Sequence, residues 1–160
     1  AALPQKTLVE RGYKGPIYQT YGIANNDFLK VAGKDAEGAV FAAGGVVVAD
    51  QLDPSNPTRP IAMGEIQAYE NAYGKGSMNI FAANTIDTNL LLRKALPAAL
   101  AKAKPGTAEF RAALRDALEQ VRELVTTQGI INMTPEDHVG YDKRAVVAIQ
   151  VKNGAWRYVK

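Results

Sequence analysis

Hydrophobic and polar positions switch between a helical and a strand-like spacing along the first third of the chain. Residues 4–11 have helical composition and stop at Gly12, a residue type that commonly follows a helix end. The apolar run 17–20 predicts a short strand, and a residue at 25–27 can cap a helix that runs to about Ala32. Helix, strand and helix joined by short links are typical of a parallel α/β sheet.

Two short apolar runs follow, and a loop separates them from a second helical region. Residues 38–43 and 45–49 are rich in alanine and valine and are divided at Gly44, so we expect a strand, a bend and a second strand. The prolines of 53–57 exclude regular structure there. From about 59 to 73 the spacing becomes helical, and four residues share one face: Ala62, Ile66, Tyr69 and Tyr73.

The second half of the chain contains the clearest helical patterns. A helix is predicted from about 79 to 94, and Pro97 is expected to kink or restart it because proline lacks a backbone donor. Residues 107–128 carry a continuous apolar stripe with charged side chains on the opposite face, and Thr107 can cap this helix. The pattern is typical of a helix that packs on a sheet.

The chain ends in a predicted hairpin. Residues 145–151 and 155–159 are strand-like, and the Asn153-Gly154 pair between them favours a tight turn. Few strands are predicted before this hairpin. A self-sufficient doubly wound domain would be more regular, so we expect the chain to be part of a larger protein.

The composition argues against several classes of protein. The 160 residues are 47% hydrophobic and 22% charged, as in an ordinary soluble globular domain. The 19 basic and 16 acidic residues are interspersed, which argues against a nucleic-acid surface. The absence of cysteine excludes disulfides, thiol catalysis and cysteine-ligated metals. No apolar run reaches the roughly 20 residues of a membrane span, and residues 1–6 do not resemble a secretory signal.

No constellation of residues points to catalysis, a metal or a cofactor. His138 is the only histidine and lacks further ligands at metal-binding spacing, so we interpret it as part of a structured turn. The glycines of 44–45 and 74–76 lack the spacing of a phosphate-binding loop. The acidic residues 136–137 and Asp142 are interpreted as solvated loop carboxylates rather than a paired acid site.

The segment 18–26 is the most informative candidate for binding. It leaves the end of a predicted strand, passes through Gly22 and reaches a predicted helix start. Ligands of open α/β sheets bind outside the carboxyl ends of the strands, and free N–H groups at helix starts attract carboxylates. An ordinary strand-to-helix loop would have the same sequence features, so both interpretations stay open at this point.

Several passages, in order along nearly the whole chain, resemble one family. Residues 9–17 contain the Gly-Tyr-Lys-Gly-Pro passage between a helix and a strand, and 27–33 followed by 36–38 give Phe-Leu-x-x-Ala-Gly and Ala-Glu-Gly. The tail, 129–140 and then 153–156, is similar to the C-terminus of one branch of the same family. The chain thus resembles the type I periplasmic solute-binding proteins of ABC importers, of the branched-chain amino acid type.

The resemblance implies an α/β fold with two three-layer lobes joined by hinge crossings, which close on a ligand. It assigns residues 1–42 to the second lobe, 43–140 to the first lobe, and 141–160 to a return into the second lobe. A family member is more than twice this length, so the fold is expected to be incomplete without an N-terminal half. That half holds the loops that usually bind the ligand's carboxylate.

The resemblance also implies site residues, five from the second-lobe loop that faces the cleft and two from the following helix: Thr20, Tyr21, Gly22, Ile23, Ala24, Phe81 and Asn84. Amino-acid binders can place an acid near the position of Tyr21, against the ligand's ammonium group. Because tyrosine carries no negative charge, an aromatic or aliphatic carboxylate becomes the more attractive ligand. The family's usual Tyr-Asp pair in this helix reads Ile86-Asp87 here, which weakens the case for a tyrosine contact from it.

The implied function is that of a non-enzymatic, periplasmic receptor for a small carboxylate such as an amino acid or an aromatic or aliphatic acid. Its expected partners are this ligand, an ABC permease in the membrane and the missing N-terminal half, with no nucleic acid and no cofactor. The alternative is a ligand-sensing regulatory domain of the same fold. A chain that stops four residues after Trp156 favours the transport receptor.

Overall fold

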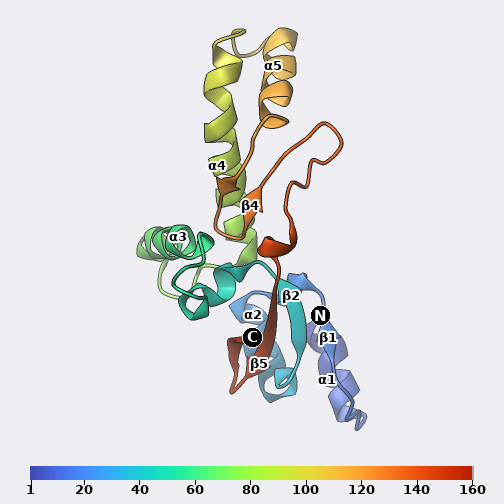
Figure 1. Cartoon of the computed structure of the whole chain (residues 1–160). Helices are drawn as coiled ribbons and strands as arrows, with labels where there is room; N and C mark the ends of the chain where they lie inside the picture. The colour runs from blue at the N-terminus through green and yellow to red at the C-terminus, as the bar shows by residue number, and fades with distance from the viewer. Residues whose placement is uncertain (160) are drawn as a thin grey trace.

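The computed structural model describes residues 1–159, which form an α/β base and a helical arm that rises from it (Figure 1). Both ends of the described chain lie in the base. The base contains these elements: α1 (Ala2–Glu10), β1 (Tyr18–Gln19), η1 (Tyr21–Ile23), α2 (Asn26–Ala32), η2 (Gly33–Ala36), β2 (Val40–Ala43), β5 (Val147–Lys152) and β6 (Ala155–Val159). Between base and arm lie η3 (Gly45–Gln51), α3 (Thr58–Tyr73) and η4 (Lys143–Ala145). The arm consists of α4 (Ile80–Leu100), α5 (Ala108–Leu118), β3 (Leu124–Val125) and β4 (Ile130–Ile131).

The sheet of the base is mixed rather than parallel throughout. Its strand order is β1-β2-β5-β6, and β1 pairs with β2 in parallel, as the helix-strand-helix pattern predicted. β5 returns from the arm and pairs with β2 antiparallel, with Phe41 opposite Ile149. β6 then folds back on β5 through a turn in which Asn153 and Gly154 have φ values of 55° and 68°. Positive φ at both turn positions suits Asn-Gly, so the predicted hairpin is confirmed.

The larger hydrophobic core lies between the sheet, α2, η3 and the first turns of α3 and α4. Trp156 of β6 stacks on Phe28 of α2 with ring centroids 6.2 Å apart and meets Phe41 of β2 edge-on at 5.1 Å. The start of α2 is fixed by Asn25, whose side chain accepts a hydrogen bond from the backbone N–H of Phe28 at 3.0 Å. The predicted cap at 25–27 is therefore confirmed, and it places the end of η1 against this core.

A smaller core holds the arm together. It contains Ala95 of α4 and Val121, Ile131 and Met133 from the segments that follow α5. α4 passes through Pro97 and continues to Leu100, so the helix does not restart there. The carbonyl that proline leaves without an intrahelical donor belongs to Arg93, which lies on the exposed side where water can satisfy it.

Two further expectations fail, one because the segment packs on the core and one because it pairs with a nearby strand. The run 45–49 is not a strand: β2 ends at Ala43, and 45–51 forms the short helical turns of η3, which bury Val46 and Val48 against the larger core. The helix predicted over 107–128 ends at Leu118. The apolar residues beyond it continue the helical spacing, but 124–125 pair with 130–131 as a two-stranded sheet.

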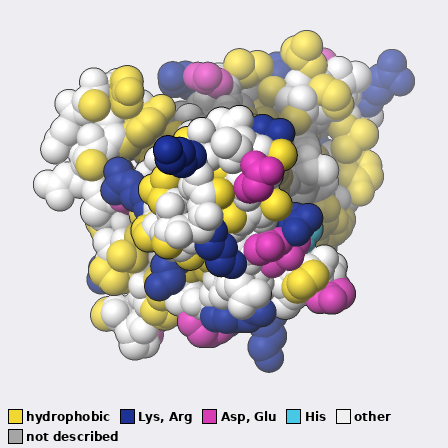
Figure 2. All heavy atoms as spheres, turned by 90° about the horizontal axis from the view of Figure 1, so that it is seen from above, with side chains coloured by type: hydrophobic (Ala, Val, Ile, Leu, Met, Phe, Trp, Pro, Cys, Tyr) yellow, Lys and Arg dark blue, Asp and Glu magenta, His cyan; other side chains and the backbone are white. Residues whose placement is uncertain are grey.

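The two cores divide the chain differently from the implied lobes, since η3, α3 and the start of α4 contribute to the core of the base. The assignment of 1–42, 43–140 and 141–160 to lobes remains a prediction. Viewed from above, down onto the arm, basic and acidic side chains are interspersed over the face (Figure 2).

Candidate ligand-binding site

The loop that follows β1 presents one large side chain and buries the rest of its apolar residues. Tyr21 opens η1 and is 41% exposed, and Thr20 and Gly22 beside it are also exposed. Ile23 and Ala24 are buried in the core of the base, and the Ala24 carbonyl accepts a hydrogen bond from the N–H of Ile80 at 3.3 Å. Of the five predicted loop residues, Tyr21 therefore presents a large exposed side chain, while the last two anchor the loop.

The start of α4 brings two predicted residues to Tyr21. Asn79 caps this helix by accepting hydrogen bonds from the N–H groups of Phe81 and Ala82, which fixes the first turn. The rings of Phe81 and Tyr21 meet edge-on with centroids 6.4 Å apart. One turn further along, the Asn84 side-chain amide donates to the Tyr21 hydroxyl at 2.6 Å. The structure thus unites Tyr21, Phe81 and Asn84 across 63 residues of sequence.

Gln128 extends this group and was not predicted. Its side-chain amide donates to Asn84 Oδ1 at 2.7 Å, and the residue is only 7% exposed. A Cβ built on Gly44 would lie 2.6 Å from Gln128 Oε1 and 2.7 Å from Gln128 Cβ, so a side chain at position 44 would displace Gln128. Glycine at the end of β2 is therefore what admits Gln128 to the site.

Beneath these residues lies a buried carboxylate, Asp87, which is 3% exposed. One carboxylate oxygen accepts hydrogen bonds from the N–H and hydroxyl of Thr127 at 2.8 and 2.7 Å. The other accepts from the Tyr141 hydroxyl at 2.9 Å and from the Gln128 amide at 3.4 Å. Burial raises the pKa of Tyr141 well above its ordinary value, a hydrogen bond with Thr126 opposes this shift, and the neighbouring Asp87 reinforces it.

A groove of about 630 Å³ opens beside this network, where η1, β2, α4 and the chain returning to β5 meet. Its only lysine is Lys143, which makes no ion pair with a carboxylate of the described residues. The lining residues are Tyr21, Ala42, Ala43, Gly44, Asn84, Gln128, Val139, Tyr141, Asp142, Lys143, Ala145 and Val146.

The acidic residue of this lining is already engaged. Asp142 pairs with Arg144 at 2.7 Å, and Arg144 also bonds Glu123 at 3.2 Å. Hydrogen bonds from Arg144 hold the pKa of Asp142 below its ordinary value; those from Arg144 and then Asn132 do the same for Glu123. Lys143 makes no ion pair within residues 1–159, but its charge also lowers the pKa of Asp142.

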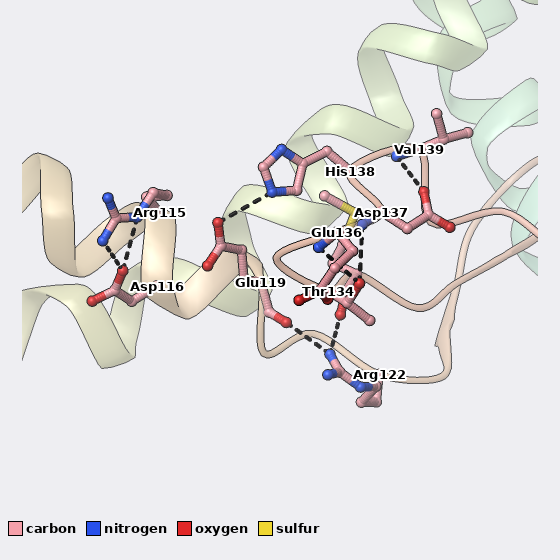
Figure 3. Close-up of polar contacts among 10 residues, drawn as sticks. Arg115, Asp116, Glu119, Arg122, Thr134, Glu136, Asp137, His138 and Val139 are labelled. Atoms are coloured by element: carbon pink, nitrogen blue, oxygen red, sulfur yellow. Dashed lines mark hydrogen bonds and ion pairs between the residues drawn. The ribbon is translucent and has the colours of Figure 1, made fainter.

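His138 lies away from the groove, as the interpretation of a structured turn requires. Its Nε2 lies 3.1 Å from Oε1 of Glu119, the residue that follows α5, and Figure 3 shows the imidazole pointing toward this carboxylate. In the same turn Asp137 accepts hydrogen bonds from the N–H groups of Val139 and Gly140. Arg122 ties the turn to the arm through the Met133 carbonyl. This loop is therefore internally bonded.

Within residues 1–159, no group of three or more histidine, cysteine or acidic side chains is arranged to hold a metal ion. Likewise, none of the helices in that range has both the length and the apolar character needed to cross a bilayer.

Comparisons with known proteins agree with the fold. No family model matches the sequence, and no curated protein matches it. Among solved structures, an extracellular ligand-binding receptor from Rhodopseudomonas palustris is 44% identical with a TM-score of 0.94, covering 99% of this chain and 44% of that receptor. One from strain HaA2 of the same species is 42% identical with a TM-score of 0.94, at the same coverage.

A leucine-binding protein from Thermotoga maritima shares the fold at 22% identity, with a TM-score of 0.74 over 99% of this chain and 40% of that protein. The resemblance drawn from the sequence is thereby confirmed: the chain is built like the C-terminal half of an extracellular ligand-binding receptor with the type I periplasmic-binding fold. It spans 44% of the length of each of the two Rhodopseudomonas palustris receptors.

Several residues of the site escaped the sequence reasoning for identifiable reasons. Thr127 and Gln128 fell inside the helix predicted over 107–128, which hid them. Tyr141 and Lys143 lie on the segment that returns to the base, and no local pattern marks them. Asp87 did leave a trace, because it lies three residues after Asn84 and so shares a face of α4 with it.

Proposed function

We propose that this chain forms one part of a two-lobed periplasmic receptor that captures a small carboxylate in a cleft between its lobes. The groove beside Tyr21, Asn84, Gln128 and Lys143 is the observation that carries the proposal. It combines polar groups that can orient an anion with a cation that has no ion-pair partner among the described residues. The names of the similar receptors, which include extracellular ligand-binding receptors and a leucine-binding protein, support a binding role.

The chemistry of the groove favours an acid over an α-amino acid. The Lys143 ammonium attracts a carboxylate, and the ring of Tyr21 can lie against an apolar body. Phe81 does not line the groove but meets the Tyr21 ring edge-on. An α-amino acid would also need an acceptor for its ammonium group, but Asp142 is paired with Arg144. An aromatic or aliphatic monocarboxylate therefore fits these residues best.

The receptor would act without chemical change to its ligand and deliver it to an ABC permease in the membrane. The fold also requires the N-terminal half, because the similar receptors are more than twice as long as this chain. We expect the isolated chain to bind its ligand at least about tenfold more weakly than the parent protein, since one wall of the cleft is missing.

A thermal-shift screen of aliphatic and aromatic acids on the parent protein tests the proposal. At least one acid should raise the melting temperature, and Tyr21→Ala should reduce that shift. Tyr73→Ala is the matched control, because Tyr73 is exposed at the end of α3 and lies outside the groove. The proposal fails if no acid stabilises the protein, or if the two tyrosine variants behave alike.

A further inference from the structure

Asp87 is linked to the groove by hydrogen bonds whose donor and acceptor roles are fixed from one residue to the next. A carboxylate can only accept hydrogen bonds, so the Gln128 side chain must turn its NH2 group toward Asp87 Oδ2, 3.4 Å away. The same NH2 group also donates to Asn84 Oδ1 at 2.7 Å. Both hydrogens of this amide are therefore used, and the orientation of Gln128 is fixed.

That orientation determines the next one. Since Asn84 presents its oxygen to Gln128, its NH2 group faces the other way and donates to the Tyr21 hydroxyl oxygen at 2.6 Å. Amide side chains choose between two flipped orientations according to their neighbours, and here each neighbour selects the same one. The series runs from Asp87 through Gln128 and Asn84 to Tyr21.

At the end of the series, the orientation of Asn84 decides whether the Tyr21 hydroxyl donates or accepts a hydrogen bond from a ligand. Its oxygen already accepts a hydrogen bond from Asn84, so its own proton is free to be donated to another acceptor. Tyr21 lines the groove and is 41% exposed, whereas Asp87 is absent from the lining. The buried Asp87 thus determines that the exposed Tyr21 hydroxyl is a donor.

The other partners of Asp87 hold it in the accepting state. Thr127 donates through both its N–H and its hydroxyl, and Tyr141 donates through its hydroxyl. Because the pKa of Tyr141 is raised, this phenol keeps its proton and remains a donor.

We propose that Asp87 is a positioning residue that makes Tyr21 a hydrogen-bond donor, and thereby selects ligands that present an acceptor at this point of the groove. The inference rests on the proposed function, which supplies the ligand. It adds that Asp87, through Tyr21, determines which ligands are selected. It predicts discrimination between a carboxylate, which only accepts, and the matching primary amide, which can also donate.

The test compares benzoate with benzamide as probes of the parent protein, by chemical-shift titration of ¹⁵N-labelled protein. In Asp87→Asn the side chain at 87 gains an NH2 group, so Gln128 and Asn84 can flip and Tyr21 can donate to Asn84 instead. The benzoate dissociation constant should rise about tenfold while that of benzamide changes less. A residue with only a structural role would weaken both probes by the same factor.

Two further variants control the experiment. Ala113→Gly loosens α5, far from the series, and should leave the ratio of the two dissociation constants unchanged. Gln128→Leu interrupts the series but leaves the bonds of Thr127 and Tyr141 to Asp87 in place. It should lower the preference for benzoate as Asp87→Asn does, and it serves in its place if that variant fails to fold.

A measurement without ligand separates this inference from the proposed function. The side-chain NH2 resonances of Gln128 and Asn84 should move in Asp87→Asn but not in Ala113→Gly. If they stay in place in folded Asp87→Asn, or move equally in both variants, Asp87 does not set the polarity. If they move but neither probe binds the parent protein, the inference about orientation stands and the proposed function fails.

Discussion

Replacing Gly44 with alanine should damage the site through a single contact. The backbone of Gly44 has φ −63° and ψ 148°, which alanine adopts freely, so the change introduces no backbone strain. The added Cβ would lie 2.7 Å from Gln128 Cβ and 2.8 Å from Gln128 Cγ. Neither atom can swing away by rotation at the end of the side chain, and Gln128 is 7% exposed.

The cost in folding free energy follows from the distance by which the new Cβ and Gln128 must move apart. Carbon atoms in contact prefer about 3.5 Å or more, so the two segments must separate by roughly 0.8 Å. Overpacking of this kind costs about 1–3 kcal/mol. The displaced amide also strains its hydrogen bond to Asn84, for which the loss is about 1 kcal/mol. Together, Gly44→Ala should destabilise the chain by about 2–4 kcal/mol.

Urea unfolding followed by circular dichroism measures this free energy, and Gly64→Ala is the matched control. Gly64 lies within α3, where an added Cβ meets nothing within 4 Å, so alanine there should stabilise the chain by about 1 kcal/mol. Gln128→Gly removes the opposing Cβ and should restore part of the loss in the double variant. Equal effects of the two alanine substitutions, or no rescue by Gln128→Gly, would refute the reasoning.

Three further predictions concern the rest of the molecule. Trp156→Ala removes the ring that contacts Phe28 and Phe41 and should cost about 3–5 kcal/mol, measured by urea unfolding with circular dichroism. Thr107→Ala removes the cap of α5 and should cost about 1 kcal/mol, whereas Thr107→Ser should retain most of it in the same assay. Arg144→Ala should let the pKa of Asp142 rise toward its ordinary value in a carboxyl NMR titration. Because that pKa is lowered in the folded chain, the pair stabilises above the unfolded pKa and its contribution disappears as the pH falls through the folded pKa; an unchanged Asp142 titration in the variant would contradict the pairing.

Local signals in the sequence predicted the elements whose ends are fixed by a side chain or a turn. The cap at Asn25, the cap at Thr107 and the Asn153-Gly154 hairpin all depend on neighbouring residues, and all three are present in the structure. The run 45–49 failed because its apolar residues are needed against the core of the base, not in a ladder. The helix predicted beyond Leu118 failed for a different reason, because 124–125 pair with 130–131 as a short two-stranded sheet.

The residues of the candidate site also differ in whether the sequence could indicate them. Tyr21, Phe81 and Asn84 were found through family resemblance, and the structure brings them together. Gln128 could not be found, because its role depends on the glycine at the end of β2, 84 residues earlier in the chain. Asp87 was named only as part of the family's Tyr-Asp pair, and no sequence pattern indicated its hydrogen bonds to Gln128 and Tyr141.

The central claim is that this chain supplies part of a carboxylate-binding cleft, with Lys143 as the cation that makes no ion pair among the described residues. Isothermal titration of the parent protein with the best acid from the thermal-shift screen, before and after Lys143→Met, tests it most directly. The account predicts that the substitution weakens binding by about tenfold, since it keeps most of the apolar side chain and removes the charge. Binding that is unchanged in Lys143→Met, or an uncharged ligand that binds as tightly as the acid, would contradict the account.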